Sequence, residues 1–370
     1  MKKKIFSFIL SMVFIITLFT GCGSKQSEVA SKNSKGDKVQ SAVIKDMAGR
    51  EVKLPEKIER IYGTNPAGTT MIYTLAPDKL VGWNVKLTEE EKSYLPEKYR
   101  NLPELGGWYG KNTTGNPEVI LKAKPDIIIH VASINDKEKS TADRIQKQLN
   151  IPVVVADTSL LNSDKTYEFL GKIFKEEEKA KKLGDYCRKT IDEVRNEVSK
   201  IPEDKRIRVY YAEGLNALET EPKGSVRNEV LEMAGGENVI KSSSNKSSYG
   251  HTKISLEQLI KLNPQVIITR ATIENGKIQS SYDNIVKNKD WQTISAVKDK
   301  KVYQIPQLPY NWFDRPTTIN RIIGIKWING LLYGGNNKEN IKNEAKEFYK
   351  EFYHYEPTDK QLQEILYRAQ

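Results

Sequence analysis

Beyond residue 40, short apolar runs alternate with longer stretches in which apolar positions recur at intervals of three and four residues. The runs are rich in Ile and Val, which is typical of strands in a parallel sheet covered on both faces. This alternation of strands and helices favours an α/β fold. The predicted elements outside the repeated unit described next are a hairpin at Val43–Leu54 and strands at Arg60–Gly63, Val153–Asp157, Arg206–Ala212 and Lys301–Ile305.

One α/β unit occurs twice in the chain. Asn116–His130 (NPEVILKAKPDIIIH) and Ser255–Thr269 (SLEQLIKLNPQVIIT) align without a gap, about 140 residues apart. In each copy a capping residue begins a short helix, a proline ends it, and an apolar strand follows. We therefore predict two α/β lobes, with a chance resemblance between two α/β stretches as the alternative.

The segment between the two lobes is predicted to be helical. From 164 to 200 it contains no proline, is dense in Lys and Glu, and places apolar residues at helical spacing. We predict one long helix with a glycine as its point of bending. The folded chain then divides into an N-terminal lobe at 41–160, a bridging helix at 161–201 and a C-terminal lobe at 202–370.

The chain begins with the features of a secretory signal. Three lysines precede an apolar run that is shorter than the about 20 residues of a membrane span. The following Gly21-Cys22 resembles the lipobox of bacterial lipoproteins, with Phe19 where Leu is commoner. We predict a signal peptide at 1–21, lipid on Cys22, and a tether at 22–40 whose polar composition does not support folding. The alternative is an ordinary signal peptide with a chance cysteine.

Composition narrows the range of partners. The 370 residues exceed the usual size of one domain, and the net charge of +11 is spread along the chain rather than gathered in one stripe. Nucleic-acid binding is therefore not expected. A diffuse positive field suits an anionic surface or an anionic ligand, and solubility alone also explains it. If Cys22 carries lipid, Cys187 has no partner and no disulfide framework is expected.

Enzyme motifs are absent from the sequence. It lacks the G-x-S-x-G elbow, the H-E-x-x-H zinc motif, a Walker loop and the Rossmann nucleotide fingerprint. Its only histidines are His130, His251 and His354, too few for the His-rich site of a zinc or manganese carrier. We expect neither catalysis nor a permanently bound cofactor.

Five segments carry a family resemblance through their order and spacing: Asp46–Arg50, Leu80–Trp83, Ala234–Val239, Trp291–Val297 and Asn311–Arg315. Together they resemble the class III substrate-binding proteins of ABC importers, the iron-chelate and cobalamin type. The resemblance implies two Rossmann-like lobes with central parallel sheets, joined by one long α-helix, with a ligand cleft between the lobes. It also implies a monomeric receptor at the extracytoplasmic face of the cell membrane that serves an ABC permease and ATPase.

The resemblance gives the repeated unit a second meaning, because family members dock with permease arginines through an acidic residue on each lobe. Glu118 and Glu257 stand at the matching positions of the two copies. Both also lie in a first helical turn, where a negative charge complements the helix dipole. Dipole complementarity explains each glutamate singly but does not require one on both lobes, so we favour docking.

The expected ligand is an iron-siderophore or related metal chelate, with cobalamin, haem, a nickel chelate or a molybdate-type oxyanion as alternatives. A lipid-anchored sensor or adhesion protein on the same fold is the alternative of another class. Candidate ligand residues lie beside strand ends or repeat units, where aromatic faces and Arg, His or Tyr can hold a chelate. They are Asn65, Trp108, Tyr109, Tyr211, Arg227, Tyr249, His251, Trp312 and Arg315, with His251 and Tyr249 as candidate metal ligands.

Overall fold

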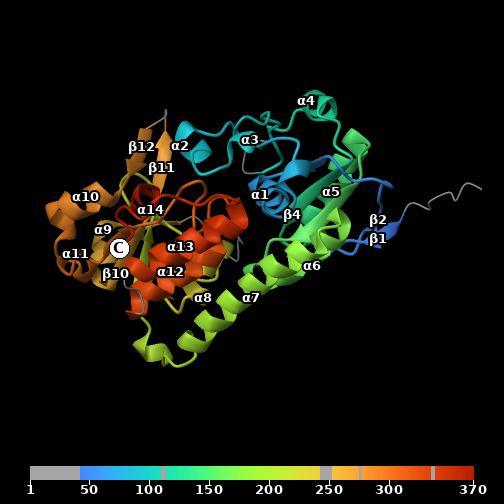
Figure 1. Cartoon of the computed structure of the whole chain (residues 1–370). Helices are drawn as coiled ribbons and strands as arrows, with labels where there is room; N and C mark the ends of the chain where they lie inside the picture. The colour runs from blue at the N-terminus through green and yellow to red at the C-terminus, as the bar shows by residue number, and fades with distance from the viewer. Residues whose placement is uncertain (1–41, 110–113, 242–251, 275–276, 335–337) are drawn as a thin grey trace, which may run out of the picture. The chain divides into compact units, whose positions relative to one another are not determined.

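Two parallel sheets form the centres of the two lobes (Figure 1). Neighbouring strands within each sheet are parallel, which confirms the predicted α/β fold. The N-terminal sheet has the order β3 (Ile61–Gly63), β4 (Ile127–Ala132) and β5 (Val153–Asp157), and the C-terminal sheet has the order β13 (Val302–Gln304), β10 (Val266–Thr269), β6 (Arg208–Ala212) and β8 (Glu237–Asn238).

The computed structural model describes residues 42–370 except 110–113, 242–251, 275–276 and 335–337. These described residues belong to one compact unit, Gln40–Gln370. The predicted signal peptide, Cys22 and the tether lie outside them, as do Tyr249 and His251. A search of the described helices finds none that is both long enough and apolar enough to cross a membrane.

The N-terminal sheet is covered on both faces, because successive strand residues point to opposite sides. Ile127 and Ile129 of β4 belong to the core that includes α1 (Pro66–Leu75). Ile128, between them, belongs to a separate core that includes α5 (Asp136–Leu149). This two-sided burial explains why the sequence of β4 is continuously apolar.

The C-terminal sheet is built in the same way. Tyr211 of β6 packs in the core that contains α8 (Glu229–Met233) and α12 (Arg321–Tyr333). Its neighbour Tyr210 packs on the other face, in the core that contains α9 (Leu256–Leu262). Both lobes therefore place a helix layer on each side of a parallel sheet.

The repeated unit is confirmed in detail. Asn116 caps α4 (Pro117–Lys122), and Ser255 caps α9 through a capping box with Gln258. Each helix is followed by a residue with left-handed backbone immediately before the proline, Lys124 (φ 47°) and Asn263 (φ 41°). The two helix–strand connections therefore share their caps and their turns.

The likeness extends to residues that the alignment did not include. Arg60 precedes β3, and its Nη2 donates to the Ala123 carbonyl after α4 at 2.5 Å. Arg208 begins β6, and its guanidinium donates to the carbonyl oxygens of Leu262 and Asn263 at the end of α9. In both lobes, then, an arginine at the start of the first strand satisfies the last carbonyl groups of the repeated helix.

The bridging segment differs from its prediction. The stretch 164–200 is two helices, α6 (Ser163–Phe174) and α7 (Glu177–Val198), so a single helix bent at a glycine is wrong. The break falls at Lys175, which has left-handed backbone at φ 59°. The two helices pack against each other as a hairpin, and a Cβ on Gly184 would lie 3.2 Å from the backbone of Asp164. The glycine therefore serves close helix packing and not a bend.

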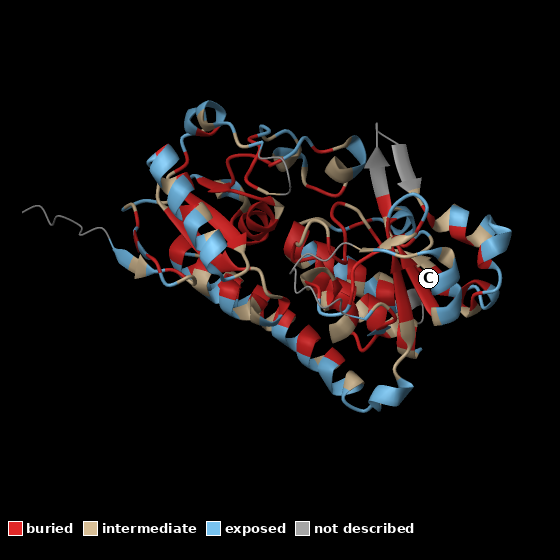
Figure 2. Ribbon diagram, turned by 180° about the vertical axis from the view of Figure 1, so that it is seen from behind, coloured by how far each residue is buried: buried red, intermediate tan, exposed pale blue. Residues whose placement is uncertain are grey.

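Helix α7 is the long helix between the two lobes, and Figure 2 shows buried residues along one side of it. Its first half packs against α6, and its second half packs against α12, where Lys326 pairs with Glu193 at 3.2 Å. The amphipathic pattern that predicted a helix here thus reflects packing against a different helix at each end.

The C-terminal helices also contact the N-terminal lobe. They are α13 (Lys338–Tyr353) and α14 (Asp359–Ile365). The hydroxyl of Tyr73 in α1 donates to the Tyr353 carbonyl at 2.8 Å, and the ring of His354 lies 5.7 Å from the Tyr73 ring. The last helices therefore connect the lobes a second time, in addition to α7.

The remaining elements are short. The predicted hairpin near residue 49 is confirmed by β1 and β2, which pair antiparallel. The other bounds are β1 (Val43–Lys45), β2 (Glu51–Lys53), η1 (Pro77–Lys79), α2 (Glu89–Lys92), α3 (Glu97–Arg100), η2 (Leu160–Asn162), η3 (Glu203–Lys205), β7 (Glu219–Thr220), η4 (Val226–Asn228), β9 (Thr252–Lys253), β11 (Ala271–Glu274), β12 (Lys277–Ser280), α10 (Tyr282–Lys287), η5 (Lys289–Trp291) and α11 (Ser295–Lys298).

Candidate functional site

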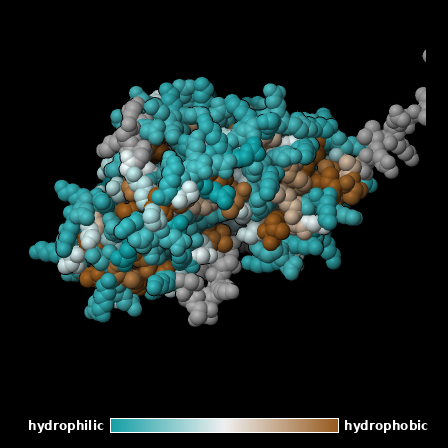
Figure 3. All heavy atoms as spheres, turned by 90° about the horizontal axis from the view of Figure 1, so that it is seen from below, coloured by the Kyte–Doolittle hydropathy of each residue, from teal (hydrophilic) through white to brown (hydrophobic). Residues whose placement is uncertain are grey.

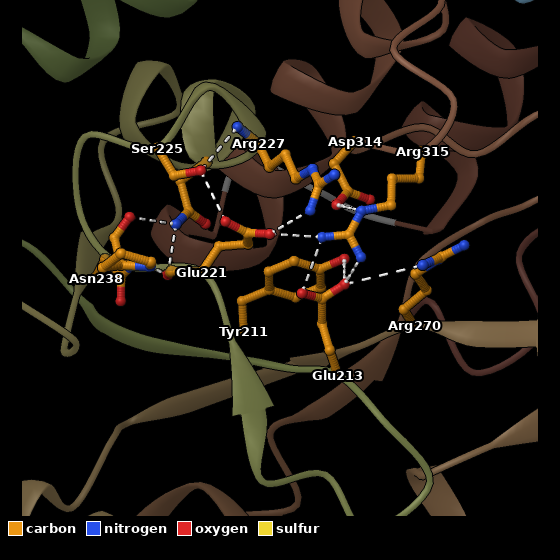
Figure 4. Close-up of polar contacts among 11 residues, drawn as sticks. Tyr211, Glu213, Glu221, Ser225, Arg227, Asn238, Arg270, Asp314 and Arg315 are labelled. Atoms are coloured by element: carbon orange, nitrogen blue, oxygen red, sulfur yellow. Dashed lines mark hydrogen bonds and ion pairs between the residues drawn. The ribbon is translucent and has the colours of Figure 1, made fainter. Parts of the chain in front are cut away.

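Arginines and carboxylates gather at the carboxyl ends of β6 and β10. Glu213 directly follows β6, and Arg270 directly follows β10. Arg315 Nη2 donates to Glu213 Oε2 at 3.0 Å and to Glu221 Oε1 at 2.7 Å. Arg227 Nη1 donates to the same Glu221 oxygen at 2.6 Å. Figure 4 shows Arg315 held between the two glutamates, so this guanidinium is fixed in place by its neighbours.

A buried acid lies under this cluster. Asp314 is 1% exposed and pairs with Arg315 Nε at 3.3 Å. Burial raises the pKa of the Asp314 carboxyl to about 6, although the nearby Arg315 lowers it. Tyr211 forms the floor, because its hydroxyl donates to Glu213 Oε1 at 3.1 Å and its ring lies 4.7 Å from that of Phe313. Burial raises the pKa of Tyr211, which keeps the phenol neutral.

The charges of the cluster balance only when every acid is ionised. Arg227, Arg270 and Arg315 supply three positive charges, and Glu213, Glu221 and Asp314 supply three negative ones. Protonation of Asp314 leaves one net positive charge among these six residues. The cluster therefore becomes a better environment for an anion as the pH falls through the titration of Asp314.

A cavity of about 510 Å³ opens beside the cluster. Its walls include Arg270, Arg315, Gln307 and Tyr310 from the C-terminal lobe and Glu91 from the N-terminal lobe. Arg270 differs from Arg315 in having a weak anchor, a 3.9 Å contact between its Nη1 and Glu213 Oε1. Its buried Nε has no hydrogen-bond partner within the described ranges. A guanidinium with unused donors at a cavity wall is suited to an anionic group of a ligand.

Two of the predicted aromatic residues serve the core. Trp108 is buried, and its ring centroid lies 6.4 Å from that of Tyr62 in an edge-on contact. Trp312 is fully buried, and its Nε1 donates to the Tyr349 hydroxyl at 3.1 Å. Neither lines the cavity. We therefore leave both tryptophans out of the proposed site.

The other predicted residues divide into two groups. Tyr211, Arg227 and Arg315 come together in the cluster, although they lie far apart in sequence. Asn65 instead caps α1, accepting from Gly68 N at 2.8 Å and donating to the Val131 carbonyl at 2.9 Å. Tyr109 lies in the loop after Trp108 and is partly buried, and it is not among the residues of the cavity wall. Tyr249 and His251 lie outside the described residues.

Sequence reasoning missed four members of the cluster. Glu213 and Arg270 had a usable signal, because each directly follows a predicted strand at the sheet edge where α/β folds bind ligands. Asp314 lies within the loop that carried the family resemblance but was not singled out. Glu221 lies in a loop without local signal, and only the folded chain brings it beside Arg315.

The two lobes also meet through a buried arginine. Arg321, at the start of α12, is 3% exposed and donates to the Thr158 carbonyl and to Glu229. The other oxygen of Glu229 accepts from the Leu160 amide at 3.2 Å. A second cavity, of about 470 Å³, lies beside this contact and is lined by Asp157, Glu229 and several hydroxyl groups. The polar contact ties the end of β5 to the C-terminal lobe.

The repeated helices present matching outer faces. Glu118 and Glu257 are both exposed in the first turn of α4 and α9. Neither carboxylate has an ion-pair partner in the part of the chain that the structure describes. One residue of each helix, Ile120 and Leu259 at equivalent positions, is fully buried against its own lobe.

The sequence profile of the periplasmic binding protein family matches residues 63–308. The chain belongs to this family. It is of the class III type, and its relatives are solute-binding proteins of ABC transporters, which bind their ligands without catalysis. Family members act outside the cytoplasm together with a permease and ATPase complex.

Individual relatives align over most of their length. The molybdate-binding protein MolA of Haemophilus influenzae is 24% identical, with 86% of this chain and 93% of MolA covered. The Fe(3+)-citrate-binding protein YfmC of Bacillus subtilis is 23% identical, with 82% and 89% covered. Among solved structures, an ABC transporter solute-binding protein from Sulfurospirillum deleyianum is 34% identical with a TM-score of 0.77, covering 87% of this chain and 98% of that one.

Proposed function

We propose that this binding protein captures an anionic metal chelate, of the ferric citrate or siderophore type, in the cavity beside Arg270 and Arg315. The observation that carries the proposal is the Arg270 side chain, which lines the cavity, is 24% exposed, and is held by the acids of the cluster only through a 3.9 Å contact with Glu213. A carboxylate or catecholate oxygen of a chelate could accept a hydrogen bond from the exposed part of this guanidinium. Such charge-assisted hydrogen bonds contribute about 1.5–3 kcal/mol each.

The size of the cavity favours a chelate over a small anion. A volume of about 510 Å³ lies in the range of sites that hold a whole organic ligand. A molybdate-type oxyanion is the second candidate, because MolA aligns with 86% of this chain and the arginine cluster also suits a tetrahedral anion. The two candidates differ in how many of the cavity walls they would touch.

Calorimetric titration of the purified protein with ferric citrate and with molybdate separates the two candidates. Arg270→Gln should weaken binding of the true ligand at least about tenfold, because it removes one charge-assisted contact. Arg195→Gln is the matched control, since Arg195 is exposed on α7 and its loss changes the net charge equally. Equal affinity in Arg270→Gln and Arg195→Gln would refute the assignment of the cavity.

A direct contact between the protein and the metal stays a prediction for Tyr249 and His251. Among the residues that the structure describes, no group of three or more His, Cys, Asp or Glu side chains is arranged to hold a metal ion. Iron coordination by Tyr249 would add a charge-transfer band in the visible spectrum that Tyr249→Phe abolishes. An unchanged spectrum of the iron-loaded variant would show that the chelator alone holds the metal.

We also propose that the protein works as a lipid-anchored monomer. Lipid on Cys22 and a tether at 22–40 would hold the folded lobes near the extracytoplasmic face of the membrane, within reach of the permease. Glu118 and Glu257 would pair with permease arginines, which is supported by their exposure and by their equivalent places on the two lobes.

A further inference from the structure

Exposed apolar side chains are concentrated on the two repeated helices. Nine large apolar residues of the described chain are exposed, and three of them, Val119, Leu121 and Ile260, lie on α4 and α9. Helix α4 has only 6 residues and α9 only 7. Single exposed apolar residues are ordinary on a protein surface. A concentration of such residues on two short helices is not ordinary and indicates a surface that binds a partner.

Two of the three residues occupy the same position in the repeat. Leu121 aligns with Ile260, and they are 45% and 36% exposed. Val119 aligns with the polar residue Gln258, so its exposure has no counterpart on the other lobe. Figure 3 shows a different face, seen from below in the view of Figure 1, which is mostly hydrophilic with several groups of hydrophobic side chains. The outward position of Leu121 and Ile260 is thus apolar in both copies of the repeat, whereas the position of Val119 is not.

The paired apolar residues adjoin the paired glutamates. Leu121 follows Glu118 by three positions, and Ile260 follows Glu257 by three, so each pair shares one helix face. Helix propensity gives no reason for an exposed Ile in α9, since it forms helices less well than Leu or the long polar residues. Each lobe thus presents the same small surface, an exposed aliphatic side chain beside a carboxylate that forms no ion pair with any described residue.

We infer that Leu121 and Ile260 are the apolar half of a duplicated docking surface, and that each inserts into an apolar depression beside a basic residue of the permease. The inference rests on the proposed docking role of Glu118 and Glu257. Because the two surfaces are equivalent, the partner that fits them presents the same receptor surface twice, as a permease of two like halves does. The carboxylates then steer and orient the complex, and the aliphatic residues slow its dissociation.

The test measures binding of the ligand-loaded protein to the detergent-solubilised permease and ATPase complex at several salt concentrations. Leu121→Ser with Ile260→Ser should weaken docking at least about tenfold, from the loss of two buried aliphatic side chains. This loss should persist in high salt. Glu118→Gln with Glu257→Gln should instead remove most of the salt dependence, because screening acts on charge pairs.

The chain offers a matched control on the same helix. Val119→Ser removes an exposed apolar residue that lacks a repeat partner, so docking should be unchanged. All variants should keep wild-type affinity for ferric citrate or molybdate, whichever binds, and wild-type melting temperature, since the substituted side chains are exposed. If the Leu121 and Ile260 variant docks as Val119→Ser does, the inference is overturned while the glutamate pairs can still stand. If the glutamate variant also docks normally with unchanged salt dependence, the proposed docking surface itself is wrong.

Discussion

Replacing Gly324 by alanine tests how the arginine cluster is held in place. Gly324 lies in α12, where an added Cβ would sit 1.8 Å from the carbonyl oxygen of Trp312. Real Cβ atoms do not approach a neighbour closer than 3.0 Å, so the two backbones must separate by at least 1.2 Å, the difference between 3.0 and 1.8. Arg315 follows Trp312 by three residues and should move with that segment.

Two opposing terms decide the effect on stability. Alanine in a helix interior is favoured over glycine by about 1 kcal/mol. Overpacking against backbone costs about 1–3 kcal/mol or more, because a carbonyl group has no rotamer into which it can retreat. Displacement of Arg315 also stretches its hydrogen bonds to Glu213 and Glu221, each worth about 1.5–3 kcal/mol. The net expectation is a destabilisation of roughly 2 kcal/mol, or a melting temperature lower by about 3 °C for a folded unit of this size.

The assay combines thermal unfolding with ligand titration. Gly324→Ala should lose both stability and affinity for the bound anion. Gly334→Ala is the matched variant, because Gly334 ends the same helix at φ 75° and no atom of the described residues lies within 4 Å of an added Cβ. It should lose stability through its backbone conformation but keep affinity. If Gly324→Ala binds as tightly as the wild type, Arg315 is not positioned through the Trp312 backbone.

Two further predictions concern charge and anchoring. The raised pKa of Asp314, about 6 against an ordinary 3.8, means that its contribution to stability is complete below about pH 3.8 and is lost as the pH rises through 6. The unfolding free energy of the wild type relative to Asp314→Asn should therefore fall by on the order of 1–3 kcal/mol from pH 4 to pH 7 in chemical denaturation, and a constant difference would contradict the burial of an ionisable acid. Cys22→Ala should release the protein from the membrane fraction or leave it unprocessed, and unchanged mass and fractionation would exclude lipidation at this residue.

The sequence predicts best those features that depend on neighbours along the chain. The caps at Asn116 and Ser255, the prolines that follow, and the apolar strands are all local, and the structure confirms them. The break between α6 and α7 was not predicted because Lys175 and Glu176 are common in helices. Neither is a glycine or a proline, and the Glu176 side chain does not cap α7. The close packing of the two helices, at Gly171 against Ala180 and at Gly184 against Asp164, becomes visible only in the folded chain.

The site was only partly within reach of sequence reasoning for the same reason. Tyr211, Arg227 and Arg315 were predicted from their places in loops and near strand ends, and they do converge. Trp312 lies three residues from Arg315, but its side chain is buried in the core, where the indole donates a hydrogen bond to the Tyr349 hydroxyl of α13. A partner 37 positions away leaves no trace in the local pattern, so an aromatic residue in a loop is a weak guide to a ligand surface.

The contact of the last helices with α1 has a consequence for export. The hydrogen bond and the ring contact of Tyr73 are made with Tyr353 and His354, about 280 residues later in the chain. A protein that crosses a membrane N-terminus first cannot finish its first lobe until nearly all of the chain has emerged. Until then, part of the apolar surface of the N-terminal lobe is exposed. Such exposure promotes aggregation, which chaperones counteract. A chain that is truncated just before residue 353 should therefore lack the contacts of Tyr73 as well, so that the N-terminal lobe is also incompletely packed.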